Sequence, residues 1–310
     1  MRKFIARRIV TSLVALIIST MVIFAISRMM GDPRVNLLPA QGYGLNQSEW
    51  EAAGRRLHLD KPIPIQYLFW LGDVLRGDLG QDLVDRREIT AKLIPKLAPT
   101  LLLAISAWIF ATVIGPPLGV LAAVKRGSIW DLLGRSIAIS GQSLPTFWVG
   151  ILGILIFAVW LRWLPVGTMG EGIPIRHLVM PVFTLGWLAM AGYVRLVRSS
   201  MLEVLDSEYI KLARAKGVGE FSVIWKHGFR NAVIAPLTYG SLLLAGLITG
   251  SVAVETVFAW PGIARWAVEA VFTNNLPVLV AVTLMFTVLF VVTNFLVDIL
   301  YALADPRVRY

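Results

Sequence analysis

The residues best suited to recognition chemistry lie in a polar, basic segment, Glu208–Pro236, set between two long apolar runs. It begins Glu-Tyr-Ile-Lys-Leu-Ala-Arg-Ala-Lys-Gly and continues through Lys226, His227 and Arg230. Lysine and arginine donate hydrogen bonds to acidic or carbonyl groups, and small residues let a second backbone come close. The chemistry that these residue types suggest is non-covalent docking against another protein.

A short helix is predicted at the start of this segment, with Asp206 or Ser207 capping its first turn and Gly217 or Gly219 ending it. Positions 209, 213 and 217 then share one stripe of the helix, an aromatic residue followed by two almost bare backbone positions. A solvated amphipathic connector at the lipid headgroups is an equally good interpretation of the residues alone. If the segment docks, its contact residues are Tyr209, Lys211, Ala213, Arg214, Ala215, Lys216 and Gly217.

No pattern in the chain predicts catalysis or metal binding. The histidines His58, His177 and His227 lie between the apolar runs, and none has a partner at metal-ligand spacing. The sequence contains neither a Gly-x4-Gly-Lys-Ser/Thr phosphate loop nor a Gly-x-Ser-x-Gly nucleophile turn. Glu255 and Asp298 fall near the ends of apolar runs, where we expect water to reach them, so a proton relay through a membrane is not predicted. The chain has no cysteine, which excludes disulfides and thiolate chemistry.

Composition places the chain in a membrane. Of its 310 residues 57% are hydrophobic and 15% are charged, and the mean hydropathy is +0.72, values too apolar for an ordinary soluble domain. The net charge of +10 does not indicate nucleic-acid binding, because most of the basic residues stand beside apolar runs, as a topology signal does.

Six apolar stretches are close to the roughly 20 residues that a helix needs to cross a bilayer. A cleaved signal peptide is the alternative for the first stretch, but its apolar run is long and no small-residue cleavage site follows, so an uncleaved helix is favoured. The expected spans are Ile9–Ser27, Thr100–Val124, Leu132–Trp160, Leu178–Val194, Leu237–Val257 and Val278–Leu303. The fold class is therefore an all-α integral membrane protein with six principal helices.

The distribution of lysine and arginine predicts the orientation. With the N-terminus inside, the inner segments carry most of the basic residues, and the two short outer loops hold only Arg162, Arg176 and Arg265. Both termini and the docking segment, about residues 199–236, are then cytoplasmic. We expect a first helix with its cytoplasmic N-terminus at 1–27, an extracytoplasmic insertion at 28–97, a transmembrane core at 98–304 and a cytoplasmic tail at 305–310. Within the insertion, helices are predicted at 48–59, 65–76 and 86–97, the last lying against the membrane.

Small residues and prolines interrupt three of the spans, at Gly115–Gly119, Ser143–Gly150 and Gly240–Gly250. Structural kinks and close helix packing are the plainer interpretation. The alternative is that some breaks line a pathway, because irregular backbone at membrane depth persists only inside protein or beside water. The candidate pathway residues are Ser143, Pro145, Phe147, Gly246, Gly250, Glu255 and Trp260.

The order Ala213-Arg-Ala-Lys-Gly217 followed by His227-Gly-Phe-Arg-Asn231 resembles the cytoplasmic EAA loop of binding-protein-dependent ABC transporter permeases, in the form of the peptide/nickel group. Motifs along nearly the whole chain resemble the first permease subunit of that group. Two positions depart from its usual pattern: Gln81 stands where serine is common, and Lys211 stands at the usual acidic first position of the loop. The matching motifs are Ala6–Arg8, Gly31–Pro33, Leu59–Pro62, Gln66–Tyr67, Gly77–Gly80, Pro99–Leu101, Pro145–Phe147, Leu164–Val166, Glu255–Gly262 and Asp305–Arg309.

This resemblance implies a permease subunit of an importer in a bacterial or archaeal cytoplasmic membrane. The implied partners are a second, similar permease, two cytoplasmic ATPase subunits and an extracytoplasmic binding protein that delivers the substrate. ATP and Mg²⁺ would bind to the ATPase subunits, and this chain would bind no cofactor. The docking segment would then couple ATPase closure to alternating access. Dipeptides, oligopeptides, glutathione, nickel complexes and oligosaccharides all remain open as substrates.

Two other classes of membrane protein are alternatives. An ion-driven secondary carrier predicts inverted repeats and charged residues inside the membrane, and neither is evident in the sequence. A membrane scaffold that recruits a cytoplasmic partner through the docking segment predicts no transport. The proteins that copurify with the chain distinguish all three hypotheses.

Overall fold

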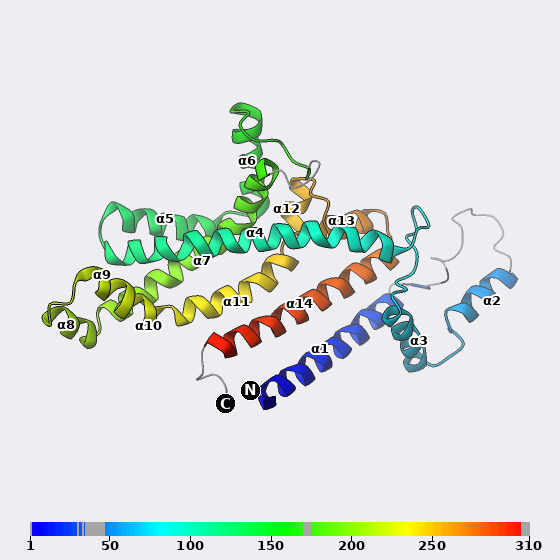
Figure 1. The fold of residues 1–310 in the computed structure, drawn as a ribbon. Helices are drawn as coiled ribbons and strands as arrows, with labels where there is room; N and C mark the ends of the chain where they lie inside the picture. Colours follow the sequence, from blue (N-terminus) through cyan, green and yellow to red (C-terminus); the bar gives the residue numbers. More distant parts are fainter. Residues whose placement is uncertain (1, 30, 33, 35–46, 170–174, 305–310) are drawn as a thin grey trace. The chain divides into compact units, whose positions relative to one another are not determined.

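The computed structural model describes residues 2–29, 31, 32, 34, 47–169 and 175–304, and almost all of their regular structure is helical (Figure 1). One isolated bridge, between Gln81 and Glu88, is the only extended pairing within these ranges. The chain divides into two compact units. Unit 1 comprises Met1–Ala98 and Gly262–Phe295, and unit 2 comprises Pro99–Pro261 and Leu296–Tyr310.

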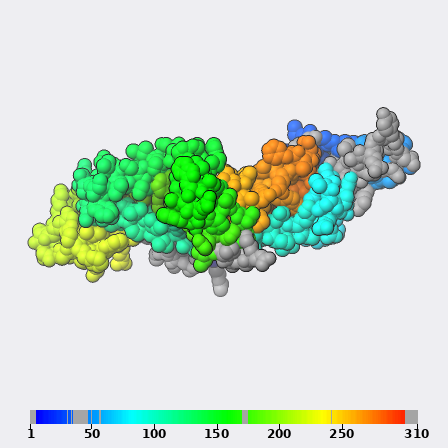
Figure 2. Space-filling view, turned by 90° about the horizontal axis from the view of Figure 1, so that it is seen from above, coloured from blue at the N-terminus to red at the C-terminus, as the bar shows by residue number. Residues whose placement is uncertain are grey.

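Unit 2 is centred on the long helix α7, whose neighbours include α5, α6 and α11. The stretch from α8 to η3 lies at the surface in the space-filling view, where it is yellow-green (Figure 2). The elements of unit 2 are the part of α4 (Ile89–Val124) after Ala98, α5 (Ile129–Ser143), α6 (Thr146–Gly153), the π-helix η2 (Ile154–Trp160), α7 (Ile175–Leu205), α8 (Glu208–Ala215), α9 (Glu220–Ser222), the π-helix η3 (Val223–Phe229), α10 (Arg230–Ala232), α11 (Ile234–Thr249) and α12 (Val252–Val257).

Glycines allow the helices of unit 2 to come close. A Cβ atom added at Gly115 of α4 would lie 2.6 Å from the Cβ of Tyr193 in α7, and one at Gly119 would lie 2.7 Å from the Cβ of Val197. Real Cβ atoms do not approach that closely, so these two positions require glycine. In α4 these two glycines therefore serve close packing. The helix does not break at Pro116 and Pro117, and α4 continues through both.

A second glycine pairing joins α7 to α11. A Cβ at Gly192 would collide with the hydroxyl of Tyr239, and a Cβ at Gly240 would collide with the hydroxyl of Tyr193. The two tyrosine rings meet edge to face with centroids 5.0 Å apart. Each helix thus offers a tyrosine to the glycine of the other, which fixes how the two helices cross.

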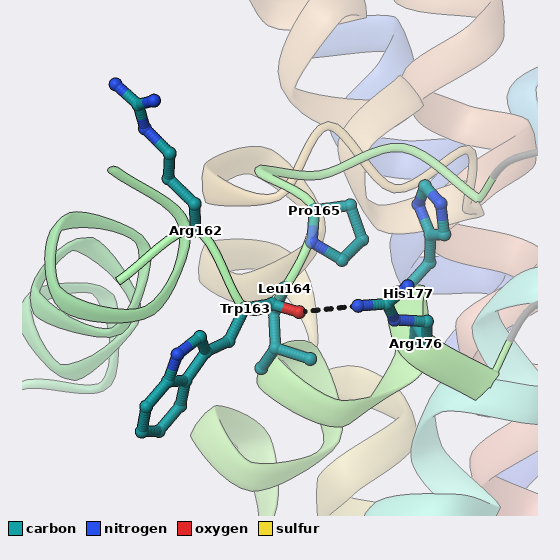
Figure 3. Close-up of a pocket in the computed structure, with 6 residues that line it drawn as sticks. All are labelled: Arg162, Trp163, Leu164, Pro165, Arg176 and His177. Atoms are coloured by element: carbon teal, nitrogen blue, oxygen red, sulfur yellow. Dashed lines mark hydrogen bonds between the residues drawn. The ribbon is translucent and has the colours of Figure 1, made fainter. Parts of the chain in front are cut away.

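Residues 161–169, the described part of the loop after η2, are held by backbone hydrogen bonds to other parts of unit 2; part of this loop is seen in Figure 3. The backbone N–H groups of Trp163 and Leu164 donate to the carbonyl of Phe157, at 2.8 and 3.2 Å. Further along, the N–H of Thr168 donates to the carbonyl of Phe258 at 2.9 Å. These backbone bonds hold the loop in one position beside the first turn of α7.

Unit 1 contains α1 (Arg2–Met29), α2 (Gln47–Arg56), α3 (Ile63–Leu75), the first part of α4, α13 (Ile263–Phe272) and most of α14 (Leu276–Ala304). Its core lies where α4, α13 and α14 meet. Ile89 and Leu93 of α4 are fully or almost fully buried there against Ile263, Trp266 and Val278. The apolar start of α4 is thus a packed helix of this unit.

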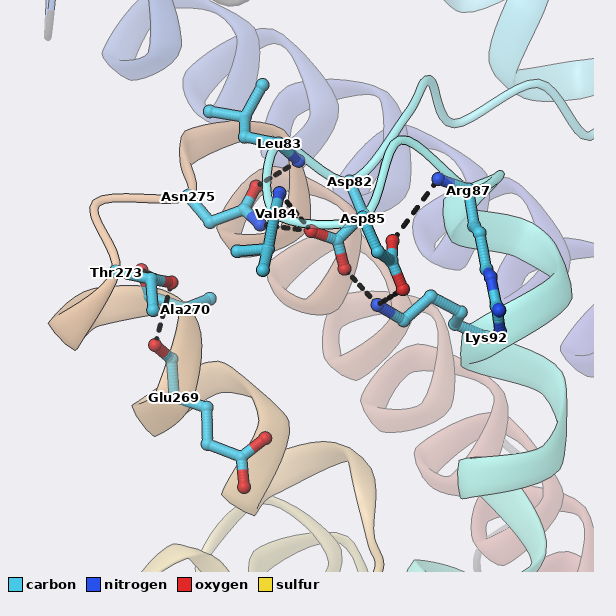
Figure 4. A network of polar contacts seen from close by, with 10 residues as sticks. All are labelled: Asp82, Leu83, Val84, Asp85, Arg87, Lys92, Glu269, Ala270, Thr273 and Asn275. Carbon is cyan, nitrogen blue, oxygen red and sulfur yellow. Dashed lines mark hydrogen bonds and ion pairs between the residues drawn. The ribbon is translucent and has the colours of Figure 1, made fainter. Parts of the chain in front are cut away.

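A polar cluster attaches the loop before α4 to the turn between α13 and α14 (Figure 4). The buried Asp82 carboxylate pairs with Lys92 and accepts hydrogen bonds from the Asn275 amide at 2.6 Å and the Val84 N–H at 2.9 Å. Burial opposes ionisation of Asp82, but these donors outweigh it, and the pKa of the carboxyl lies below its usual value. Lys92 also pairs with Asp85 at 2.9 Å.

The all-helical prediction is confirmed. Within the described residues four helices are long and apolar enough to cross a membrane, and there are six spans if each of two bent pairs counts as one. The spans predicted at 9–27, 178–194 and 278–303 correspond to α1, α7 and α14, each of which is longer than expected. The predicted cytoplasmic tail, residues 305–310, lies outside the described residues.

Several boundaries are wrong in an instructive way. The separate helix predicted at 86–97 is the first part of α4, which continues past Pro95 and Pro99, and its Ile89 and Leu93 pack against Trp266. The third span, predicted as one helix, is bent by 108° between α5 and α6. Pro145 causes this break, since it forces Leu144 into extended backbone with φ −91° and ψ 128°. The fifth predicted span, 237–257, is not one helix: α11 covers Ile234–Thr249, α12 follows separately, and α11 forms a bent pair with the segment Glu220–Ala232 before it. The helix α13 was not predicted.

Candidate functional site

The predicted docking helix is α8, which begins after Ser207 and ends in a glycine turn. Gly217 has φ +76°, a left-handed conformation that glycine adopts at little cost. Its N–H donates to the carbonyl of Arg214 at 2.9 Å, and the N–H of Val218 donates to the carbonyl of Ala213 at 3.2 Å. This pair of bonds is the Schellman motif, so Gly217 rather than Gly219 ends the helix.

One side chain anchors α8 to the rest of unit 2. Ile210 is fully buried, and α8 contacts both η3 and α7. At 100° per residue, Leu212 faces away from Ile210, and it is 55% exposed. Tyr209 is exposed, with its hydroxyl 3.4 Å from the carbonyl of His227, and Ala213 is half-buried. The predicted stripe therefore lies on the flank of α8, and Leu212 lies on its outer face.

The basic residues of α8 differ in their partners. Lys211 pairs with Glu208 at 2.8 Å, and Arg214 pairs with Glu220 at 2.7 Å. The Arg214 guanidinium, through its hydrogen bonds, keeps the pKa of the Glu220 carboxyl below its usual value. Lys216 has no carboxylate partner among the described residues, so of the predicted basic contacts it is the one still open to another protein.

An aromatic row stands beside α8 and was not predicted. Phe221 is 79% exposed, and its ring lies 6.4 Å from that of Trp225, whose ring lies 5.4 Å from that of Phe229. The spacing of four residues was visible in the sequence and indicates one helical face. Together with Leu212 the row gives this surface an apolar character that the basic composition does not suggest.

The candidate pathway residues fall into two groups. Ser143, Pro145, Phe147, Gly246 and Gly250 are exposed in this chain. They include the break between α5 and α6 and the last turns of α11. These five residues remain available to line a pathway.

Glu255 and Trp260 form the other group, and both are buried. The expectation that water reaches Glu255 is wrong: its carboxyl accepts hydrogen bonds from Thr100 at 2.8 Å and Ser251 at 3.0 Å, and it is fully buried. The Trp260 indole N–H donates to the carbonyl of Pro99 at 2.9 Å. The two side chains connect α12 and the residues after it to α4, so they position this part of the core rather than line a surface.

Comparison with known proteins gives the family. Residues 115–310 match the family described as binding-protein-dependent transport system inner membrane component, and residues 1–92 match the N-terminal membrane component of such systems. Together the two matches cover most of the chain, including α8, the aromatic row and the candidate pathway.

Three curated relatives are similar over nearly their whole length. The di/tripeptide transport system permease protein DppB of Pseudomonas aeruginosa is 36% identical over 100% of this chain and 99% of its own. The oligopeptide transport system permease protein AppB of Bacillus subtilis is 37% identical over 100% of both chains. The glutathione transport system permease protein GsiC of Pectobacterium atrosepticum is 38% identical over 95% of this chain and 94% of its own.

A solved structure shares the fold. A chain of the MetNI methionine ABC transporter superposes with a TM-score of 0.57 at 21% identity, covering 69% of this chain and 96% of that one. The chain described here belongs to the family of inner-membrane permease components of binding-protein-dependent transport systems, ABC importers whose ATP hydrolysis takes place in separate subunits, and it is a multi-pass transport subunit rather than an enzyme.

Proposed function

We propose that this chain is one of two permease subunits of an ATP-driven importer for short peptides. The observation that carries the substrate class is the set of full-length relatives, whose names give di- and tripeptides, oligopeptides and glutathione, itself a modified tripeptide. An extracytoplasmic binding protein delivers the peptide, and two cytoplasmic ATPase subunits supply the energy. ATP and Mg²⁺ bind to those subunits and not to this chain.

The importer lies in a cytoplasmic membrane with both termini of this chain in the cytoplasm. The asymmetry of lysine and arginine between the connecting segments supports this orientation, which places α8 and the aromatic row inside the cell. An archaeal membrane fits the same orientation as well as a bacterial one.

The surface that receives the ATPase subunit consists of the outer and flanking faces of α8 together with the aromatic row. Its exposed apolar residues, Leu212, Phe221 and Trp225, support this role, as does Lys216, which has no carboxylate partner within the described part of the chain. The buried Ile210 and the glycine turn hold α8 in a set position, so a push on its outer face is transmitted to α7 and η3. ATPase closure would in this way shift the population between inward-open and outward-open states.

The pathway runs between this chain and the second permease. The exposed face of α11 at Gly246 and the break at Pro145 line it, because both leave room at the surface of unit 2. Buried Glu255 and Trp260 hold the outer end of this lining in place without contacting the substrate.

Copurification and peptide uptake test the proposal. The chain should bring down a second permease and two ATPase subunits, and cells should take up a labelled dipeptide or tripeptide that unlabelled short peptides compete away. Mass spectrometry of the ligand on the binding protein should identify a peptide. Uptake that continues without the ATPases and stops with a protonophore would support a secondary carrier. An unrelated soluble partner with no uptake would support a scaffold.

A further inference from the structure

Two of the outer arginines have no carboxylate partner among the residues that the structure describes. Arg162, Arg176 and Arg265 are the basic residues that the proposed orientation leaves in the short outer loops. Arg265 pairs with Glu269 at 2.9 Å. Across the part of the chain that the structure describes, neither Arg162 nor Arg176 pairs with an acid. The two lie 14 positions apart in the sequence, yet both line one pocket of the folded chain.

The place is a pocket of about 350 Å³ lined by Arg162–Pro165 and Arg176–His177 (Figure 3). Its size is within the range of sites for small molecules or headgroups. Arg176 donates from Nη2 to the carbonyl of Trp163 at 2.9 Å and so turns toward the loop, while the Arg162 side chain extends away from it (Figure 3). The backbone bonds to Phe157 and Phe258 hold this loop in position.

Apart from Nε2 of a neutral His177 ring, the polar side-chain groups of this pocket are donors. His177 Nδ1 lies 2.7 Å from the carbonyl of Thr168 and 3.2 Å from that of Gly167, so Nδ1 carries the hydrogen. Arg176 uses one of its five N–H groups, and the guanidinium has no acceptor. A planar fork of N–H donors matches an oxyanion such as phosphate or carboxylate.

The surroundings of the pocket are apolar and exposed. Trp160 is 68% exposed and Trp163 is 61% exposed, and Val166 and Ile175 are exposed beside them. They stand at the end of the bent candidate span that finishes at Trp160. Exposed tryptophans beside arginines at the end of a span are typical of the membrane–water interface, where the rings lie at headgroup level.

We propose that this pocket, which we call the outer arginine site, binds the phosphodiester headgroup of an anionic phospholipid in the outer leaflet. Arg176 contacts the phosphate from beside the loop, and Arg162, whose flexible side chain extends outward at the rim, turns to the same headgroup when the lipid binds. The two tryptophans and the neighbouring aliphatic residues contact the acyl chains. A free phosphate ion offers the same oxygens but nothing for the apolar rim. The site depends on the orientation proposed above and not on the peptide substrate.

Native mass spectrometry tests this site in the full-length chain purified in detergent with its copurifying subunits. The complex is titrated with phosphatidylglycerol and, separately, with zwitterionic phosphatidylcholine. One basic residue near an anionic surface changes lipid affinity about fivefold, so Arg162→Gln and Arg176→Gln should each lower phosphatidylglycerol affinity about fivefold and together about thirtyfold. Arg265→Gln, at the paired arginine, is the matched control and should leave the affinity unchanged. Retention of the copurifying subunits shows that each variant is folded.

Several outcomes would overturn the proposal. Equal binding of the two lipids, or unchanged phosphatidylglycerol binding in the double variant, would show that the pocket does not recognise the phosphate. Displacement of phosphatidylglycerol by millimolar inorganic phosphate would make it a site for free phosphate. Glu171 is the acid nearest in the sequence and lies outside the described residues. Tighter phosphatidylglycerol binding by Glu171→Gln would mean that this carboxylate pairs with the arginines and that they are not free for a lipid. Unchanged binding supports the lipid site.

Discussion

Replacing Gly217 by alanine should loosen the end of α8 without placing any bulk against a partner. Nothing lies within 4 Å of a Cβ atom built at Gly217, so the substitution causes no clash in this chain. Its φ of +76° is the difficulty, because a side chain in the left-handed conformation costs about 1–2 kcal/mol. A larger residue such as arginine would add a clash with a docked partner to this strain, so alanine gives the cleaner experiment.

Gly219 supplies the matched control two positions away. It too has open space around a built Cβ, but its φ of −58° suits any residue. Gly219→Ala should therefore be neutral, or stabilising by about 0.4–1 kcal/mol because the unfolded chain loses freedom. The two variants add the same methyl group to the same exposed turn and differ only in backbone conformation.

Hydrogen exchange and ATPase retention measure the effect. A strain of about 1–2 kcal/mol should speed exchange of the Gly217 and Val218 amides about five- to thirtyfold in Gly217→Ala, because both close the Schellman turn. If the ATPase subunit docks on α8, its apparent affinity should fall within the same range and peptide uptake should decline. Equal exchange, affinity and uptake in the two alanine variants would refute the argument. Faster exchange with unchanged affinity would favour the solvated connector over the docking surface.

Three further predictions concern the pathway, the orientation and the loop before α4. Gly246→Leu should block uptake while the subunits still copurify, because the site is exposed and a side chain meets nothing in this chain; normal uptake would remove Gly246 from the lining. A cysteine at Ser222 should react with a membrane-impermeant thiol reagent only after the membrane is opened, and one at Ser48 should react in intact cells; the reverse pattern would invert the orientation. The pKa of Asp82 is lowered in the folded chain, so the stability it confers through Lys92 is present above about pH 4 and lost as the pH falls through the lowered value. The thermal unfolding temperature of Asp82→Asn should accordingly be lower than that of the unchanged chain at pH 6, and the two temperatures should converge in acid. A constant difference across the pH range would contradict the assignment.

The docking helix was predictable because its signals are local. The eight-residue helix begins directly after Ser207 and ends just before the Gly217 turn, and such turns depend on neighbours within about five positions. The predicted side-chain cap at Ser207 does not form, because its hydroxyl donates to the carbonyl of Val204 instead. Which face of that helix points outward was not predictable. It depends on Ile210, which is buried through contacts between α8 and elements far from it in sequence, and that burial turns the predicted stripe to the flank.

The candidate pathway shows the same division. Pro145 alone indicates a break, since proline constrains the residue before it. The burial of Glu255 could not be read from its neighbours, because one of its hydrogen-bond partners, Thr100, lies 155 positions away. The position of Glu255 near the end of an apolar run suggested that water solvates its carboxyl group. In the folded chain the hydroxyl groups of Thr100 and Ser251 donate hydrogen bonds to it instead.

The sequence by itself determined that the chain spans a membrane, which segment is exposed and basic, where its short helix begins and ends, and which family its motifs resemble. These properties depend on composition, on periodicity and on interactions within a few residues. Only the tertiary structure decided that α4 continues past Pro95 and Pro99, that Glu255 is buried, and that Arg162 and Arg176 share one pocket. The physical reason is that burial and side-chain pairing between distant segments are set by the contacts of the folded chain, which local propensity does not specify.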